Sequence, residues 1–125
     1  MKLLLDCHIT KATLGALRDI APGIRAELLS DWRRGAFRRA DDAEVLMACY
    51  EERRAFLTYD LTTVPDLLRR WASEERPHSG VLFADTMAIP PNMPARVAAA
   101  VAKLAEEIGD ADLENVVLFL RGARA

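Results

Sequence analysis

Short apolar runs alternate with longer amphipathic stretches along the whole chain. Brief runs rich in leucine, valine and phenylalanine are typical of strands buried inside a parallel sheet. The sequence predicts five such strands, at Lys2–Asp6, Ile24–Leu29, Ala55–Tyr59, Val81–Ala84 and Asn115–Leu120.

The stretches between these runs repeat apolar residues at helical spacing, which predicts amphipathic helices. The predicted helices cover Ile9–Ile20, Asp41–Arg54, a segment from Thr63 through Trp71, and Pro94–Ile108. Asp41 can cap the second helix, with Glu44 three residues later as a capping-box partner. Thr63 is the expected cap of the third helix. Residues 30–40 are predicted to form a polar, arginine-rich loop.

Strands that alternate with helices predict βαβ units, with right-handed crossovers and helices on both faces of a mainly parallel sheet. The expected fold class is therefore a three-layer α/β/α fold. The chain has 125 residues, which is the length of one domain. We expect a single domain over residues 1–125.

Three of the predicted strands end with an aspartate or are directly followed by one: Asp6, Asp60 and Asp85. Because parallel strands direct their carboxyl ends to one edge of the sheet, these carboxylates are expected to converge there. Carboxylates held close together repel each other unless a cation neutralises them, and their oxygens suit Mg²⁺ or Mn²⁺.

Each acid also has a simpler interpretation. An aspartate after a strand is a common turn residue, and Asp6 could cap the helix that follows it. Asp42 and Glu44 open the second predicted helix, where negative charge is favourable for the helix dipole. For Asp60 the capping role is the weaker interpretation, since Thr63 already serves as the expected cap.

Composition excludes several classes of protein. The chain is 51% hydrophobic and 29% charged, which is typical of a folded domain and not of a disordered chain. Two cysteines do not form a disulfide framework, and the residues before Asp6 are too few for a signal peptide. No apolar run is long enough to span a membrane. We therefore expect a cytoplasmic protein without a membrane partner.

The sequence contains no P-loop, no GxGxxG, no GxSxG and no CxxC motif. This argues against P-loop NTPases, dinucleotide-binding domains and α/β-hydrolases.

Arginine outnumbers lysine by fourteen to three. Four arginines crowd the predicted loop: Arg33, Arg34, Arg38 and Arg39. The planar donor fork of a guanidinium matches a phosphate group, so this cluster is a candidate nucleic-acid-binding surface. Solvated surface charge explains the same cluster equally well.

Four segments carry a resemblance to a known family. They are LLLDCHI at Leu3–Ile9, ADDAEVLMACYEERRAFLTYD at Ala40–Asp60, HSGVLF at His78–Phe83 and LENVVLFL at Leu113–Leu120. In these segments the chain resembles the PIN-like family of uncharacterised proteins, which are distant relatives of VapC-type toxin ribonucleases. The resemblance spans nearly the whole chain and rests on the order and spacing of the acids.

The resemblance implies a cluster of acids that binds one or two divalent metals, Mg²⁺ or Mn²⁺, for attack on an RNA phosphodiester. It assigns Asp6, Asp42 and Asp60 as catalytic metal ligands, with Glu44 and Asp85 as further ligands. It also implies single-stranded or structured RNA as substrate, an antitoxin protein as partner if the chain is a toxin, and a homodimer, since related toxins commonly dimerise.

Three hypotheses follow. The first is a metal-dependent ribonuclease, the toxin half of a toxin–antitoxin pair. The second is a non-catalytic PIN-like module that binds RNA or a protein. It is favoured by a departure from the family pattern T-x-D-x-D-F, because Thr62 and Thr63 stand where the second aspartate and the phenylalanine are often found. The third is a receiver-like signalling domain, which would need paired acids after the first strand and a lysine after the last.

Overall fold

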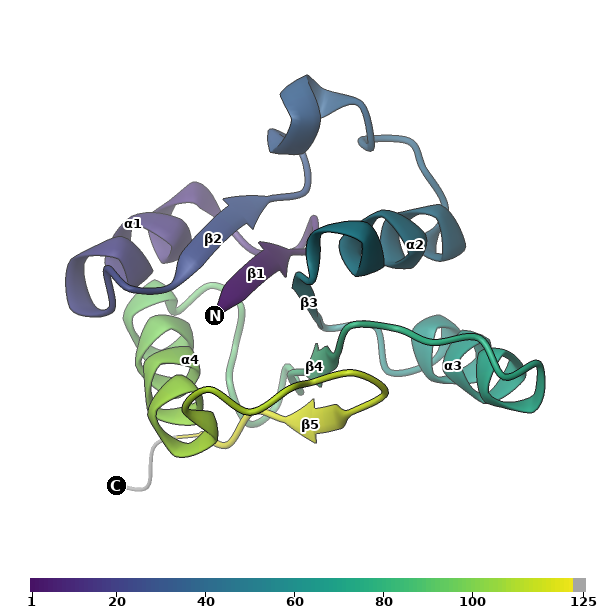
Figure 1. The fold of residues 1–125 in the computed structure, drawn as a ribbon. Coiled ribbons are helices and arrows are strands. Elements are labelled where there is room, and N and C mark those ends of the chain that lie inside the picture. The colour runs from purple at the N-terminus through teal and green to yellow at the C-terminus, as the bar shows by residue number, and fades with distance from the viewer. Residues whose placement is uncertain (123–125) are drawn as a thin grey trace.

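The computed structural model describes residues 1–122 and shows a five-stranded parallel sheet between two layers of helices (Figure 1). The strands are β1 (Lys2–Leu5), β2 (Arg25–Leu28), β3 (Ala55–Thr58), β4 (Val81–Phe83) and β5 (Val117–Phe119). The helices are α1 (Lys11–Ile20), α2 (Asp42–Glu52), α3 (Thr63–Ser73) and α4 (Pro94–Ile108), with a 3₁₀ turn η1 (Trp32–Gly35).

The strand order is β2-β1-β3-β4-β5, and every neighbouring pair is parallel. All five predicted strands and all four predicted helices are present within a residue or two of their predicted limits. The predicted three-layer α/β/α fold with a parallel sheet is therefore confirmed.

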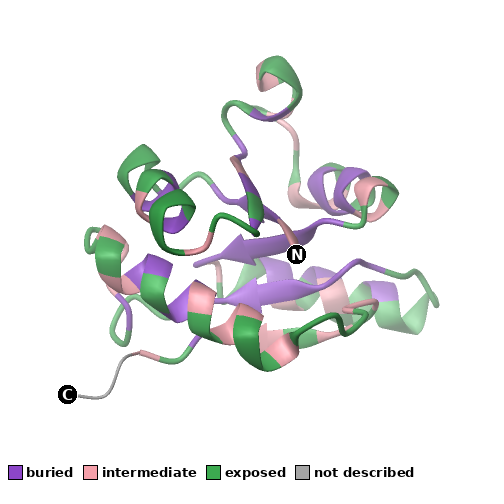
Figure 2. Ribbon diagram, turned by 60° about the vertical axis from the view of Figure 1, so that its left-hand side comes forward, coloured by how far each residue is buried: buried purple, intermediate pink, exposed green. Residues whose placement is uncertain are grey.

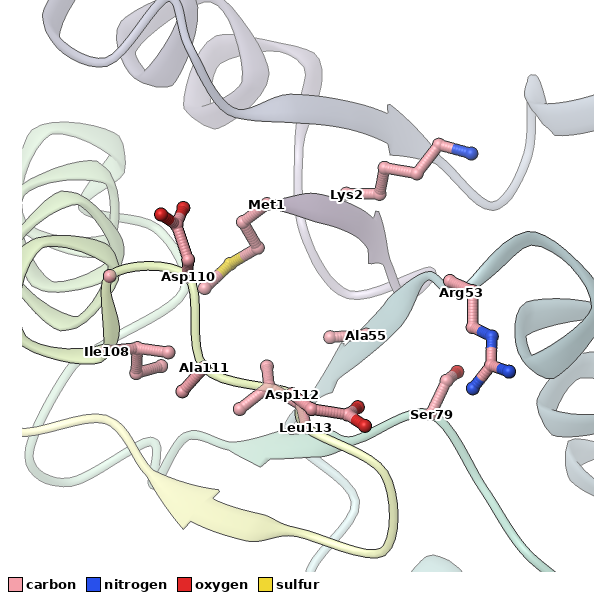
Figure 3. Close-up of a pocket in the computed structure, with 11 residues that line it drawn as sticks. Met1, Lys2, Arg53, Ala55, Ser79, Ile108, Asp110, Ala111, Asp112 and Leu113 are labelled. Carbon is pink, nitrogen blue, oxygen red and sulfur yellow. The ribbon is translucent and has the colours of Figure 1, made fainter.

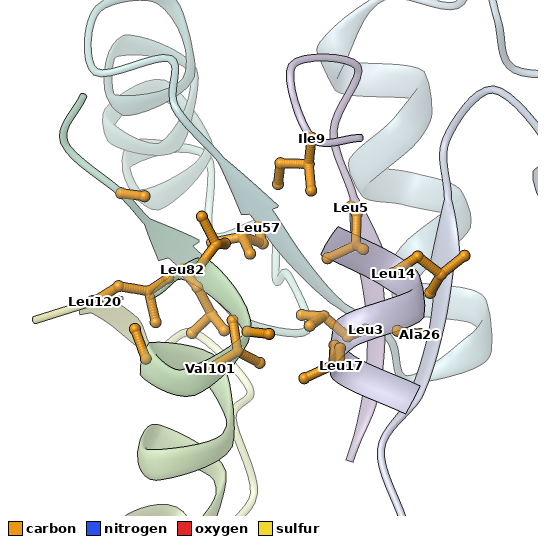
Figure 4. Close-up of a cluster of buried hydrophobic side chains, with 14 of the residues drawn as sticks. Leu3, Leu5, Ile9, Leu14, Leu17, Ala26, Leu57, Leu82, Val101 and Leu120 are labelled. Atoms are coloured by element: carbon orange, nitrogen blue, oxygen red, sulfur yellow. The ribbon is translucent and has the colours of Figure 1, made fainter. Parts of the chain in front are cut away.

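Alternating side chains divide the interior into two cores. Leu3 and Leu5 of β1 point to the face that carries α1 and α4, whereas Leu4 points to the face that carries α2 and α3. Figure 4 shows the first of these cores, and Figure 2 shows the buried strands between helices whose outer sides are exposed. Burial on both faces explains why these strands read as continuous apolar runs.

One crossover differs from the prediction. The β1–β2 and β4–β5 connections both pass over the α1/α4 face, but they step toward opposite edges of the sheet. The two connections therefore have opposite hands, so the prediction of right-handed crossovers throughout is wrong for at least one of them. The loop after β4 places Ala84 and Ile89 in the first core, which Val97 and Val101 of α4 then complete.

Helix α1 begins at Lys11 and not at Ile9 as predicted. The backbone N–H of Thr13 donates to the hydroxyl oxygen of Thr10, which is the N-cap. Ile9 remains buried in the preceding turn, so its place in the apolar pattern reflects packing and not helix.

The predicted polar loop of residues 30–40 holds a large buried side chain. Trp32 is 1% exposed and packs in the second core, with the ring of Phe37 5.0 Å from its own. The segment is therefore a largely exposed loop, as predicted, that Trp32 anchors in the second core.

Arg54 ties three strands together at the amino end of the sheet. Its buried guanidinium donates to the carbonyl oxygens of Leu3 at 3.2 Å and Arg25 at 3.1 Å. It also forms ion pairs with Glu27 at 3.1 Å and Glu52 at 3.2 Å. A buried charge with this many partners is costly to disturb, because removing it leaves carboxylates and carbonyls without a donor.

We expect Arg54→Met to lower the free energy of unfolding by about 3 kcal/mol. The neighbouring Arg53→Met is the matched control, because the Arg53 side chain is 66% exposed and its ion pair with Glu114 lies at the surface. That control should cost less than about 1 kcal/mol. Urea unfolding of both variants measures the difference, and equal losses would contradict a special role for Arg54.

Candidate functional site

At the carboxyl ends of β1 and β3 the chain leaves the sheet toward opposite faces. From β1 the chain passes to α1 on one face, and from β3 it passes to α3 on the other. In open parallel sheets such a switch point leaves a crevice where ligands bind. Asp6 follows β1 there and Asp60 follows β3 by two residues.

Asp6 is a fixed, buried carboxylate. It is 7% exposed, and its Oδ1 accepts the backbone N–H of Cys7 at 2.7 Å. Its Oδ2 accepts the hydroxyl of Thr58 at 2.6 Å. Since Thr10 caps α1, the capping interpretation of Asp6 is wrong: this carboxylate faces the β3 end of the site.

Thr58 is the residue that the sequence analysis missed. Its hydroxyl is fully buried, donates to Asp6, and accepts the backbone N–H of Asp60 at 3.0 Å. One hydroxyl thus connects the carboxylate after β1 with the backbone after β3. The available signal was a lone polar residue at the end of the otherwise apolar run AFLT.

Asp60, and not Thr63, accepts the first N–H groups of α3. Its Oδ1 accepts the backbone N–H of Thr62 at 2.9 Å and of Thr63 at 2.8 Å, whereas Thr62, the N-cap residue, makes no side-chain capping bond. Burial favours the neutral acid, but these N–H groups outweigh it and lower the pKa of Asp60. The prediction that Thr63 caps the helix is wrong, and Asp60 has a structural task as well as a candidate functional one.

Asp42 is the acid whose pKa is affected by the charges of the other two. It is the first residue of α2, and Asp41 is the N-cap that accepts the backbone N–H of Glu44 at 2.8 Å, as predicted. Burial raises the pKa of Asp42, and the charges of Asp6 and Asp60 raise it further. Asp6, Asp42 and Asp60 therefore come from separate segments and lie near enough for their charges to interact, and we define these three residues as the acidic edge.

The other two predicted ligands, Glu44 and Asp85, are more exposed than these three acids. Neither of them contributes to the raised pKa of Asp42. Asp85 Oδ1 accepts the backbone N–H of Met87 at 2.8 Å, which is a turn interaction.

Two of the four loop arginines are engaged within the protein. Arg33 forms ion pairs with Glu52 at 2.7 Å and Glu51 at 3.5 Å, and its guanidinium stacks on Trp32. Arg38 donates to the carbonyl oxygen of Ser30. Arg34 and Arg39 are exposed, and no side-chain interaction is found for them within residues 1–122.

The acidic edge fits a divalent cation by the chemistry of its donors and not by a ready-made cage. Carboxylate oxygens suit Mg²⁺ or Mn²⁺, and the mutual repulsion that raises the pKa of Asp42 would be relieved by a cation. Within the described part of the chain, however, no three Asp, Glu, His or Cys side chains are grouped tightly enough to hold a metal.

The thiol of Cys7 beside the acidic edge is not an activated nucleophile. Partial burial and then the charge of Asp6 raise its pKa, so the thiol stays protonated near neutral pH.

A separate cavity of about 470 Å³ lies at the opposite end of the sheet, between the start of β1 and the turn after α4 (Figure 3). Its polar lining includes Lys2, Arg53, Asp110 and Asp112. The charges are of both signs, and the cavity is remote from the acidic edge.

No helix within residues 1–122 is long and apolar enough to cross a membrane.

We expect Asp42→Asn to raise the free energy of unfolding at pH 7 by less than about 1 kcal/mol, since the carboxylate is partly exposed. A raised pKa means that the folded protein holds this proton more tightly than the unfolded chain, so ionisation of Asp42 destabilises the fold. The gain should shrink as the pH falls through the raised pKa. Urea unfolding at several pH values, with Asp110→Asn as the control, tests this, and a loss at pH 7 would contradict it.

Comparisons with protein-family models, with curated proteins and with solved structures gave no significant match to this chain.

Proposed function

We propose that the chain is a Mg²⁺- or Mn²⁺-dependent ribonuclease whose reaction centre is the acidic edge. The observation that carries the proposal is the position of Asp6 and Asp60 at the carboxyl ends of the paired strands β1 and β3, where the Thr58 hydroxyl connects them. Asp42 lies near enough for their charges to act on it. The edge lies at the switch point of the sheet, where ligands of such folds bind. The resemblance to PIN-like proteins implies that the substrate is RNA. It also implies that the protein is the toxin half of a toxin–antitoxin pair.

To hold a cation, the carboxylates of Asp6, Asp42 and Asp60 would have to move closer together. The bound cation would lower the pKa of water and stabilise charge on phosphate oxygens. Other residues of the chain would orient the acids and contact the phosphate. Thr58 orients Asp6 through a 2.6 Å hydrogen bond, and the N–H groups of α3 keep Asp60 ionised. Arg34 and Arg39 are the loop arginines available for phosphate contacts.

The second candidate is a non-catalytic module that binds RNA or a protein partner. It is favoured by the engagement of both Asp6 oxygens and by the capping role of Asp60, which give these acids structural reasons to be present. Its RNA binding would be insensitive to EDTA and to Asp60→Asn, and would weaken with salt if arginines contact phosphate.

We expect the purified protein to cleave single-stranded RNA or transfer RNA in the presence of Mn²⁺, and Asp6→Asn to reduce the rate at least about 100-fold. Asp110→Asn, an exposed acid near the opposite cavity, should retain the full rate. Gel analysis of end-labelled RNA measures both. Cleavage that persists equally in Asp6→Asn would point to a contaminating nuclease and remove the support for this centre.

We also expect Mn²⁺ to raise the thermal unfolding temperature of the protein, because a ligand that binds only the folded state stabilises it. The increase should be lost in Asp42→Asn and kept in Asp110→Asn, since Asp110 lines the cavity at the opposite end of the sheet. Calorimetry with and without EDTA measures the shift. An identical shift in all three proteins would locate the metal elsewhere.

A further inference from the structure

The cavity at the amino end of the sheet is lined by two cations and two acids (Figure 3). Its charged side chains are Lys2, Arg53, Asp110 and Asp112. No ion pair within residues 1–122 joins either of these cations to either of these acids. Opposite charges that line one cavity without pairing with each other are complementary to a ligand that carries both signs.

Each of the four charged side chains keeps donors or acceptors that have no protein partner in the described part of the chain. The ammonium of Lys2 donates to a carbonyl oxygen of α2 at 3.0 Å, which uses one of its three N–H groups. Arg53 contacts Glu114 through Nη1 at 3.2 Å, which leaves its Nη2 and Nε groups. Asp112 Oδ1 accepts the backbone N–H of Glu114 at 3.0 Å, which leaves its Oδ2, and within residues 1–122 the Asp110 carboxylate accepts no hydrogen bond.

A buried hydroxyl belongs to the same lining. Ser79 is 8% exposed, and its hydroxyl donates to the carbonyl oxygen of Arg54 at 2.5 Å. Because this bond uses the only proton of the hydroxyl, its oxygen can act toward a ligand only as an acceptor. A neutral N–H group in the ligand is therefore the partner that suits Ser79.

The charged groups are separated by apolar residues. In Figure 3 Asp110 lies on the α4 side of the cavity and Arg53 lies on the α2 side, with Ala55 and Leu113 between them. A ligand that meets both sides needs its ammonium and its carboxylate at opposite ends of a short chain. The cavity volume of about 470 Å³ is in the range of small-molecule sites.

We propose that this cavity binds a dipeptide, with its terminal ammonium at Asp110, its terminal carboxylate at Lys2 and Arg53, and its amide N–H at the Ser79 hydroxyl. With Asp112 the four charged side chains carry no net charge, so a ligand with an excess of either sign meets a repulsion that a zwitterion avoids. The site lies at the opposite end of the sheet from the acidic edge and does not depend on the proposed ribonuclease function.

An NMR chemical-shift titration with alanylalanine tests the proposal. The amide signals of Ser79, Gly109 and Ala111, which line the cavity, should shift to saturation with a dissociation constant of about 1 mM or lower. The N-acetylated dipeptide lacks the ammonium and the dipeptide amide lacks the carboxylate, so each should bind at least about tenfold more weakly. The compound 6-aminohexanoate keeps both charges but has no amide N–H, and it should also bind more weakly than alanylalanine.

Two variants assign the ends of the ligand. Asp110→Asn and Arg53→Met should each weaken alanylalanine binding at least about tenfold, because each removes a charge-assisted hydrogen bond. Both side chains are exposed, so neither substitution should unfold the protein. Asp19→Asn is the matched control, since Asp19 is an exposed acid outside the cavity lining and its loss should leave the affinity unchanged.

A titration that does not saturate overturns the proposal, as does wild-type affinity in Asp110→Asn or an equal loss in Asp19→Asn. Equal affinity for the acetylated dipeptide, the dipeptide amide or 6-aminohexanoate overturns the assignment of a dipeptide to this cavity.

Discussion

The parallel pairing of β1 with β3 is the constraint on which the acidic edge depends. The register sets Leu5 beside Leu57, and the ladder continues through the N–H of Asp6 to the carbonyl of Leu57 at 3.0 Å. This backbone bond places the Asp6 carboxylate within reach of the Thr58 hydroxyl. The separation of the two strand ends is therefore set by sheet geometry, which buried apolar residues on both faces keep in place.

Within this frame the three acids experience different forces. Asp60 is stabilised as an anion by N–H groups of α3, whereas Asp42 is destabilised as an anion by burial and by its neighbours. Asp6 is held by a backbone N–H and a hydroxyl. Opposite pKa shifts in adjacent carboxylates are common at functional sites, although structural networks produce them as well. A cation would act mainly on Asp42, because Asp42 carries the uncompensated repulsion.

The sequence allowed the layers and the meeting of strand-end acids to be predicted, because apolar runs and parallel strands follow from local pattern and chain direction. The sequence could not show which distant segments of the chain contact each other. Trp32 stands among arginines, and its burial depends on contacts with distant segments. Arg53 and Arg54 look alike in sequence, yet only Arg54 meets carbonyls of β1 and β2. Asp60 and Thr63 are both capable caps, and the path of the turn decides between them.

The face on which the apolar stripe of α4 packs also decides how much of strand β5 is covered. A stripe such as Val97 and Val101 requires burial but does not specify which face of the sheet provides it. In this chain α4 packs against α1, which completes one core and leaves the outer strand uncovered on the other face. An uncovered edge strand invites pairing, and most proteins block such edges with charge or extra chain. Here the exposed pair is Val117 and Phe119 on β5, which β4 separates from β3 and the acidic edge.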